Sequence, residues 1–289
     1  MNEIDLYKRV VDDCDDALKE AFIRRMNIAD KIAETKLSNG MNISSSQTDE
    51  MHVQNVARDV PVELRPMALS LWRSLARMNR GRQYSYFVKK YKDYKLSFDS
   101  ALTSELTDSE VYCTLDIAPV IENRLMLKTK VCPSSKDAIN RLSVGEAKLA
   151  AVKTNGFYDT SWLYSLMLDK NLYVNRFEIM NNGDLVAIIS KDLVANEENT
   201  IITVAFSITM TQPGDMAQKI SVFAEAGLNI EYLTVKTQNI DVDDSNNINI
   251  VFVELSGNNI NNPDVRAAFL QLEKECELFK VLGCRKSVL

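Results

Sequence analysis

The chain has 289 residues, of which 46% are hydrophobic and 26% are charged, and its formal net charge is −6. This length favours two or three domains, and the acidic balance disfavours nucleic acid as a partner, because phosphate binding needs a concentrated basic surface. No apolar run approaches the roughly 20 residues that cross a bilayer, and the first residues lack the layout of a secretion signal. We therefore expect a cytoplasmic protein without a membrane partner.

The cysteines and the histidine limit the chemistry. Five cysteines, an odd number without a C-x-x-C pair, argue against a disulfide framework and a zinc site, so we expect reduced thiols and no metal. His52 is the only histidine, and Ser-His or Cys-His nucleophile chemistry would depend on it. Its surroundings predict an exposed helix, so we interpret His52 as a solvated residue rather than a catalytic base.

Residues 1–92 are expected to form an all-helical domain. Apolar residues recur at a helical period over residues 3–37, where proline and glycine are absent, and they predict one long helix. A glycine and a serine cluster end it, a shorter helix follows over residues 51–60, and a third follows over residues 66–91. A helix of about 35 residues spans roughly 52 Å and cannot bury its apolar stripe alone. We expect it to find a partner, most simply a second copy in a homodimer.

Short β-rich segments alternate with helical ones over residues 93–199, an order that indicates a small α/β domain. We expect strands over residues 110–118, 148–154 and 184–190, and helices over residues 134–146 and 159–170. Residues 200–289 then predict strand, helix, strand, strand, helix and strand, the ferredoxin-like βαββαβ order. The expected fold class is multidomain: an all-helical domain, a small α/β domain and a ferredoxin-like domain.

The last 90 residues resemble ACT domains, which bind amino acids as regulators. The resemblance rests on Pro213-Gly214 before a helix, on Gly227-x-Asn229 before a strand, and on Leu278–Gly283. This last run is similar to the ending of the ACT domain in prephenate dehydratases. The resemblance implies an amino-acid effector and a regulatory domain over residues 200–289.

The expected effector site lies at the Pro-Gly turn. A turn at a helix start offers backbone N–H groups to a carboxylate, and Asp215 or Asn229 could hold an ammonium group. The residues implied are Gly214, Asp215, Met216 and Asn229. The plainer alternative is a turn that merely starts a helix well. The phenylalanine-sensing dehydratases have Gly-Ala-Leu-Val where this chain has Gly214–Ala217, so the sequence leaves open which amino acid would bind.

Residues 1–92 resemble the all-helical chorismate mutases, which precede a prephenate dehydratase domain and its ACT domain in enzymes of aromatic amino-acid synthesis. Arg24-Arg25, Lys36-Leu37 and the run Leu71–Gln83 carry this resemblance. It implies that chorismate rearranges to prephenate in one step that needs no cofactor and no covalent intermediate. Such an enzyme has only to hold a folded diacid and stabilise the charge that grows on the breaking ether oxygen.

By this resemblance, Arg25 binds a substrate carboxylate, and Lys36 with Gln83 donates to the ether oxygen. The spacing agrees with these roles, because eleven residues along a helix bring Arg25 and Lys36 to one face about 16 Å apart. Asn79 and Gln83 also share a face, at positions i and i+4. Asn79 stands where the family usually has serine.

Two parts depart from the family. The second helix has Ser46–Glu50 in place of Asp-x-x-Arg-Glu; it lacks the arginine, while Glu50, or less favourably Asp49, could accept the substrate hydroxyl. The family's arginine that reaches into the partner subunit's site is replaced by Lys8, with Arg9 beside it. Lysine keeps the charge but loses bidentate binding. The alternative for all these charges is a solvated helix face.

Residues 93–199 occupy the place of a prephenate dehydratase domain but are much shorter. Asn182–Leu185 replaces the expected Thr-Arg-Phe motif, and Pro119–Asn123 is only faintly similar to the family's Pro-x-Glu-Asn strand end. We expect no dehydratase activity. The leading function is therefore chorismate mutase in phenylalanine and tyrosine synthesis, with an amino acid as effector. The alternative is a non-catalytic ligand-binding or regulatory protein of the same pathway, in which both enzyme parts are relics.

Overall fold

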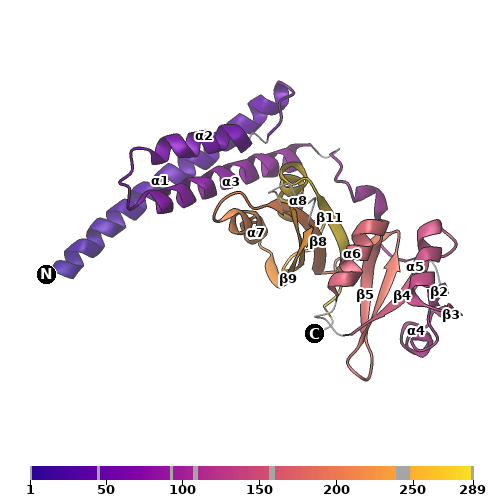
Figure 1. The fold of residues 1–289 in the computed structure, drawn as a ribbon. Coiled ribbons are helices and arrows are strands. Elements are labelled where there is room, and N and C mark those ends of the chain that lie inside the picture. Colours follow the sequence, from indigo (N-terminus) through magenta and orange to yellow (C-terminus); the bar gives the residue numbers. More distant parts are fainter. Residues whose placement is uncertain are drawn as a thin grey trace. The chain divides into compact units, whose positions relative to one another are not determined.

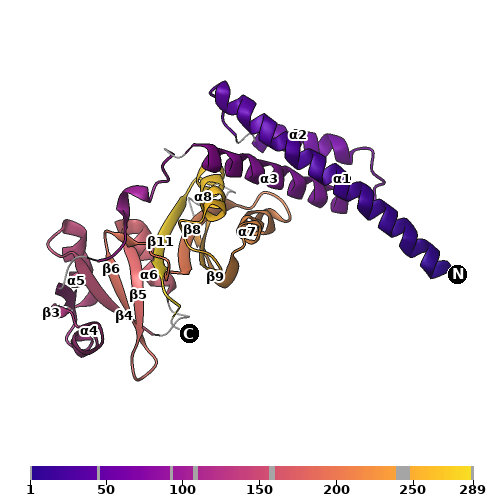
Figure 2. The same cartoon turned by 180° about the vertical axis from the view of Figure 1, so that it is seen from behind.

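The computed structural model describes residues 2–43, 46–91, 94–106, 110–155, 160–238 and 248–287. The chain forms two compact units, residues 1–93 and residues 94–289. Figures 1 and 2 show them from opposite sides.

The regular elements in the described part of the first unit are the helices α1 (Glu3–Ser38), α2 (Ser46–Ala57) and α3 (Arg65–Lys90). Asn2 starts α1 with a capping box, because its side chain accepts from the first turn of the helix while Asp5 accepts from the Asn2 backbone N–H. The three predicted helices are present, and α2 begins earlier than predicted, at Ser46.

α1 is longer than α2 and α3 can cover. Ala29 and Ala33, in its C-terminal half, are fully buried, and α3 is the helix that packs against α1 most closely. In both views the N-terminal half of α1 extends beyond the other two helices (Figures 1 and 2). The large apolar side chains exposed on the first 21 residues of α1 are Ile4, Leu6, Tyr7, Val10, Val11, Leu18, Phe22 and Ile23. The helical unit of one chain therefore leaves an apolar surface uncovered.

The second unit begins with a five-stranded mixed sheet in the order β3-β2-β4-β6-β5. Its strands are β2 (Glu110–Cys113), β3 (Lys128–Val131), β4 (Leu149–Thr154), β5 (Tyr173–Ile179) and β6 (Leu185–Ser190). β2 pairs in parallel with β3 and β4, whereas β6 is antiparallel to β4 and β5. The helices between these strands are α4 (Ala118–Leu125), α5 (Ser135–Val144) and α6 (Ser161–Lys170). β1 (Leu102–Thr103) and β7 (Leu193–Val194) form a separate parallel pair.

The sequence prediction of this sheet was incomplete. Pro119–Asn123, compared above with a strand end, lies in α4, where Pro119 suits the first turn of a helix. The strands β3 and β5 were not predicted. β3 reads Lys-Thr-Lys-Val and lies largely exposed at the sheet edge, so it lacks the apolar alternation by which strands are recognised.

Residues 201–285 form an antiparallel four-stranded sheet in the order β11-β8-β10-β9. Its strands are β8 (Ile201–Thr209), β9 (Asn229–Gln238), β10 (Ile248–Ser256) and β11 (Phe279–Arg285). α7 (Asp215–Glu225) follows β8, α8 (Pro263–Glu275) follows β10, and the two helices contact each other. The elements follow the predicted βαββαβ order.

The two sheets of the second unit share one hydrophobic core. Tyr164 of α6 packs among side chains of both sheets, and its ring centroid lies 6.2 Å from that of Phe252 on β10. β11 also passes so close to β5 that a Cβ on Gly283 would lie 2.1 Å from the carbonyl oxygen of Val174. Only glycine fits there. A domain boundary between residues 199 and 200 remains a prediction.

Candidate functional site

Arg25 and Lys36 lie on the face of α1 that packs inward. Ala29 and Ala33 occupy the same stripe between the two cations, at steps of three or four residues, and both are fully buried. Arg25 and Lys36 are themselves partly buried. α1 thus brings the two predicted cations to one face, with the small side chains of Ala29 and Ala33 between them on this stripe.

An ion pair shows which residues of α3 lie beside which residues of α1. Arg82 of α3 donates to both carboxylate oxygens of Asp30 at 2.7 Å. Asp30 lies about 7.5 Å along the helix axis beyond Arg25 and about 9 Å before Lys36. Gln83, the neighbour of Arg82, is therefore level with the stretch of α1 between the two cations.

Gln83 is the buried amide of this site. Its side chain is 3% exposed, and its Nε2 donates to Asn79 Oδ1 at 2.7 Å. Among the described side chains, four buried atoms have no hydrogen-bond partner, namely Gln83 Oε1 and the Nε atoms of Arg25, Arg65 and Arg285. Such an atom costs about 1–3 kcal/mol when it stays unpaired, so it marks a place where a ligand or water completes the bonding. Because Arg25 and Gln83 both lie along the stretch where α1 and α3 pack together, we treat this stretch as the candidate site.

Lys36 bounds this stretch at its far end. Its ammonium group donates to the carbonyl oxygen of Ile43 at 2.8 Å. Burial lowers the pKa of Lys36 below its ordinary value, while the Asp49 carboxylate acts to raise it and the Arg80 guanidinium to lower it. Charged groups of α2 and α3 therefore act on Lys36, and the three helices converge at this point.

The acidic residues of α2 are held by arginines of α3. Glu50 accepts from Nε and Nη2 of Arg73 at 3.1 and 2.7 Å, and the hydrogen bond from Arg73 holds the pKa of Glu50 below its ordinary value. Asp49 pairs with Arg80 at 2.5 Å. Glu50 is thus a fixed, ionised carboxylate. Of the two acidic residues, Asp49 is the one whose charge acts on the pKa of Lys36.

The sequence reasoning missed the arginines of α3. Arg73, Arg77 and Arg80 follow one another at steps of four and three residues, which places them on one helix face. Arg77 is only 7% exposed, although arginine is rarely buried. The spacing was visible in the sequence, but its meaning depends on the acidic residues of α2, which only the packing of the two helices brings opposite.

The other predicted site residues of the helical unit lie apart. Lys8 and Arg9 are exposed, and Lys8 lies about 25 Å along α1 from Arg25. One chain therefore does not bring them to this site, and their role in a partner's site stays a prediction. His52 is exposed on α2.

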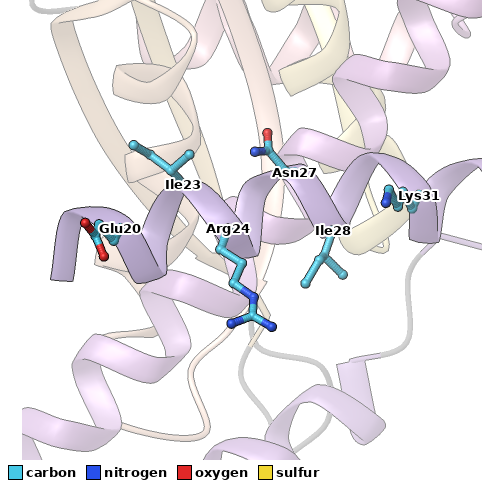
Figure 3. Close-up of a pocket in the computed structure, with 6 residues that line it drawn as sticks. All are labelled: Glu20, Ile23, Arg24, Asn27, Ile28 and Lys31. Carbon is cyan, nitrogen blue, oxygen red and sulfur yellow. The ribbon is translucent and has the colours of Figure 1, made fainter. Parts of the chain in front are cut away.

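A hollow lies on the exposed side of α1 (Figure 3). Six residues of α1 line it, namely Glu20, Ile23, Arg24, Asn27, Ile28 and Lys31. Their side chains diverge, because Ile23 and Asn27 point to one side of the helix and Arg24 and Ile28 to the other. Without a second wall from the described part of the chain, this hollow belongs to the uncovered surface of α1.

The predicted effector residues lie at the two ends of α7. Gly214, with φ +94°, precedes the helix, and no side chain caps its start. The Asp215 carboxylate accepts from the backbone N–H groups of Thr211 and Gln212 at 2.8 and 2.9 Å, so it closes its own turn. Asn229 is exposed at the start of β9, beyond the other end of α7, which is about 16 Å long. One chain does not bring Gly214 and Asn229 together.

The second unit also contains a cavity of about 440 Å³ on one face of the five-stranded sheet. Its walls include Leu127, Leu149 and Ile188, and its rim carries Arg176 and Lys286. Both rim cations are already ion-paired, with Glu178 and Glu198 respectively. The rim charges are balanced and favour neither an anionic nor a cationic ligand.

No helix in the described ranges is long and apolar enough to span a membrane. Over the same residues, no group of three or more histidine, cysteine, aspartate or glutamate side chains is placed to hold a metal ion.

The comparisons with known proteins found matches among solved structures. No family model matches the sequence, and no curated protein sequence matches it. Among solved structures, GqqA, described as a novel type of quorum quenching acylase, is 17% identical, with a TM-score of 0.47 over 62% of this chain and 94% of that one. Prephenate dehydratase from Streptococcus mutans is 13% identical, with a TM-score of 0.46 over 61% of this chain and 97% of that one.

A prephenate dehydratase from Arthrobacter aurescens in complex with L-Phe is similar to the same extent. It is 11% identical, with a TM-score of 0.47 over 62% of this chain and 90% of that one.

Proposed function

We propose that the helical unit binds chorismate between α1 and α3 and rearranges it to prephenate. The observation that carries this proposal is the pair of buried, unpartnered polar atoms, Arg25 Nε and Gln83 Oε1. Gln83 on α3 is level with the stretch of α1 that separates Arg25 from Lys36, so the two atoms and the Lys36 ammonium group lie along one stretch of these two helices. A folded diacid needs a cation for its carboxylate and hydrogen-bond donors for its ether oxygen, and these groups supply both.

In this mechanism no bond to the protein forms. Arg25 binds a carboxylate and holds the enolpyruvyl group over the ring, which removes most of the entropy cost of the folded geometry. Lys36 donates to the ether oxygen as negative charge grows there. Rotation of the Gln83 and Asn79 amides by 180° keeps the hydrogen bond between the two side chains and gives up the longer one, of 3.4 Å, from Gln83 Nε2 to the Asn79 carbonyl oxygen. It leaves a Gln83 N–H, rather than Oε1, as the unpartnered group. Gln83 then becomes the second donor to the ether oxygen.

Glu50 is proposed to accept the substrate hydroxyl. Arg73 already holds this carboxylate in place and ionised, so it can accept a hydrogen bond without titrating near neutral pH.

A specific observation also favours the second candidate, a non-catalytic ligand-binding protein. Lys36 is engaged by the Ile43 carbonyl, and the second helix has no arginine. Purified protein should be tested for chorismate loss and prephenate formation, and for chorismate binding by calorimetry. Turnover above the uncatalysed rate supports the mutase. Binding without turnover supports the second candidate, and neither binding nor turnover contradicts both.

Two further parts of the proposal concern assembly and regulation. The uncovered apolar side chains on α1 and the distance of Lys8 from Arg25 support a homodimer in which Lys8 serves the partner's site. The uncapped start of α7 at Gly214 supports binding of a free amino acid there, with its carboxylate on the backbone N–H groups. Calorimetry with phenylalanine, tyrosine and tryptophan tests the latter, and the absence of heat and of a thermal shift with all three would contradict it.

A further inference from the structure

The cavity of about 440 Å³ in the second unit lies on the face of the five-stranded sheet that α4 also covers. Its volume is within the usual range of small-molecule sites. Leu149 and Ile188 line it and belong to the core that α4 completes. The aliphatic side chains of its wall are those of Leu106, Leu125, Leu127, Leu149, Ile188 and Val194. Most of these side chains come from different elements and together form an apolar wall that suits a hydrocarbon group.

Arg176 stands on the same face of the sheet, at the rim of the cavity. Directly opposite residues of two antiparallel strands point to one face, and Arg176 of β5 is opposite Ile188 of β6. Arg176 donates through Nε to Glu178 Oε1 at 2.6 Å, and its guanidinium makes no other hydrogen bond within the described part of the chain. Its two Nη groups carry four further N–H donors, and arginine binds a carboxylate through such parallel donors. Arg176 therefore offers the cavity a carboxylate site.

Oxygen acceptors line the same cavity. Asn199 is 5% exposed, and its Nδ2 donates to the carbonyl oxygens of Val194 and Cys284 at 3.0 and 3.4 Å. Among the described residues, no donor reaches Asn199 Oδ1, and no cation pairs with the Glu105 carboxylate, which also lines the cavity. An amide oxygen and a carboxylate without protein donors accept hydrogen bonds from a ligand or from water. The cavity thus has acceptors for an ammonium group.

These groups match one class of ligand. We propose that this cavity binds a free α-amino acid with an aliphatic side chain, such as leucine. Its carboxylate binds the Nη groups of Arg176, and its ammonium group binds Glu105 and Asn199 Oδ1. Its side chain lies against Leu149 and Ile188. A ligand that carried only one of the two charges would leave either the guanidinium or the carboxylate of the rim unmatched.

Calorimetry on the whole chain compares leucine with two analogues that each lack one charge. 4-Methylpentanoate keeps the carboxylate and the hydrocarbon group of leucine, and 3-methylbutylamine keeps the ammonium group and the hydrocarbon group. Each analogue loses a hydrogen bond to a charged group, so leucine should bind at least about tenfold more tightly than either. Equal affinities for leucine and either analogue, or no binding of leucine, would overturn the proposal.

Two variants place the ligand in this cavity. Arg176→Gln should weaken leucine binding by about 10- to 100-fold, because it removes the charged donor for the carboxylate. Arg141→Gln is the matched control, since Arg141 is also partly exposed and ion-paired but does not line the cavity, and it should leave the affinity within about twofold. Leu127→Trp fills the cavity without removing a charge and should abolish binding.

The outcomes separate this site from those proposed above. Melting temperatures show whether a variant that does not bind leucine is still folded. If Leu127→Trp does not fold, Arg176→Gln decides, because its exposed pair with Glu178 contributes little to stability. Leucine that binds to Arg176→Gln as it does to Arg141→Gln lies elsewhere, for example at the start of α7, and overturns the proposal. None of these results bears on the turnover of chorismate, which the helical unit would carry out.

Discussion

Arg82 of α3 donates two hydrogen bonds of 2.7 Å each to the carboxylate of Asp30 on α1. Because both side chains are partly exposed, the pair contributes little to the free energy of unfolding. Its importance is geometric, since it sets Gln83 level with the stretch of α1 between Arg25 and Lys36. The predictions below follow from this arrangement and from the core of the second unit.

Removing either cation of α1 should remove catalysis. We expect Arg25→Ala and Lys36→Ala each to lower kcat/KM for chorismate by about 10²–10³-fold, because each loses a group that binds a carboxylate or the developing charge. Lys31→Ala is the matched control, since Lys31 lies on the same helix but on its exposed side. Initial rates of chorismate loss measure the effect. Equal rates in all three variants would contradict the proposed site.

The rate should fall on the alkaline side because Lys36 must be protonated to donate. Burial holds the pKa of Lys36 below its ordinary value of 10.5, so the protonated fraction, and with it kcat, is full at lower pH and is lost as pH rises through that lowered pKa. Asp49→Asn should move the midpoint to still lower pH, since the Asp49 carboxylate acts to raise the pKa.

Lys36→Arg supplies the check on this assignment. A guanidinium stays charged throughout the range, so the residual turnover of Lys36→Arg should show no such alkaline decline. A decline that persists unchanged in this variant would assign the titration to another group.

The uncovered part of α1 should hold two copies together. Phe22→Glu combined with Leu18→Glu places two charges on this surface and should convert a dimer to a monomer in sedimentation experiments, because burying them without partners is costly. Val62→Glu, which changes an apolar residue that is 72% exposed on the α2–α3 connection, should leave the dimer intact. A monomeric unmodified protein would contradict the proposal.

The buried ion pair Glu254–Arg285 should be sensitive to the loss of one partner. Their side chains are 9% and 5% exposed, and Glu254 also accepts from the Tyr164 hydroxyl. Arg285→Met leaves a buried carboxylate and should lower the free energy of unfolding by about 3–5 kcal/mol. Lys130→Met, which breaks a largely exposed pair with Glu110, should cost less than about 1 kcal/mol. Denaturant titration distinguishes them, and similar costs would contradict this account.

Gly283→Ala should be costly because the added Cβ meets the Val174 carbonyl oxygen at 2.1 Å. Strands β11 and β5 must then separate, and we expect a loss of about 3 kcal/mol or more, at the upper end for an overpacked core. Gly183→Ala is the comparison, because Gly183 has positive φ but open space around it. It should cost only the strain of a left-handed residue, about 1–2 kcal/mol. Thermal unfolding with equal shifts for the two variants would contradict the close approach.

The sequence predicted those helices and strands whose apolar residues recur regularly or whose ends are marked by a turn. The apolar period of α1 and the turn at Gly214 located their elements well. β3 was not predicted, because an exposed edge strand that reads Lys-Thr-Lys-Val has no buried face and therefore no alternation of apolar and polar residues. α4 was misread because eight residues give too few turns for a helical period to show.

The candidate site was predictable only where its residues share one helix. Arg25 and Lys36 could be placed together from their spacing alone. The contact of Arg80 with Asp49 could not, because it depends on how α2 returns along α3. The hydrogen bond from Lys36 to the Ile43 carbonyl oxygen could not be predicted either. Its acceptor is a backbone atom, which every residue has, and its position depends on the path of the chain after α1.

The core shared by the two sheets of the second unit decides how the proposed effector binding can be tested. A fragment beginning at residue 200 would lose the covering of Phe252 and Leu282 by α6, and it would leave Glu254 without the Tyr164 hydroxyl. Such a fragment would expose apolar surface and aggregate. The shortest piece that keeps its own interior begins at Tyr94, so titrations with amino acids belong on that piece or on the whole chain.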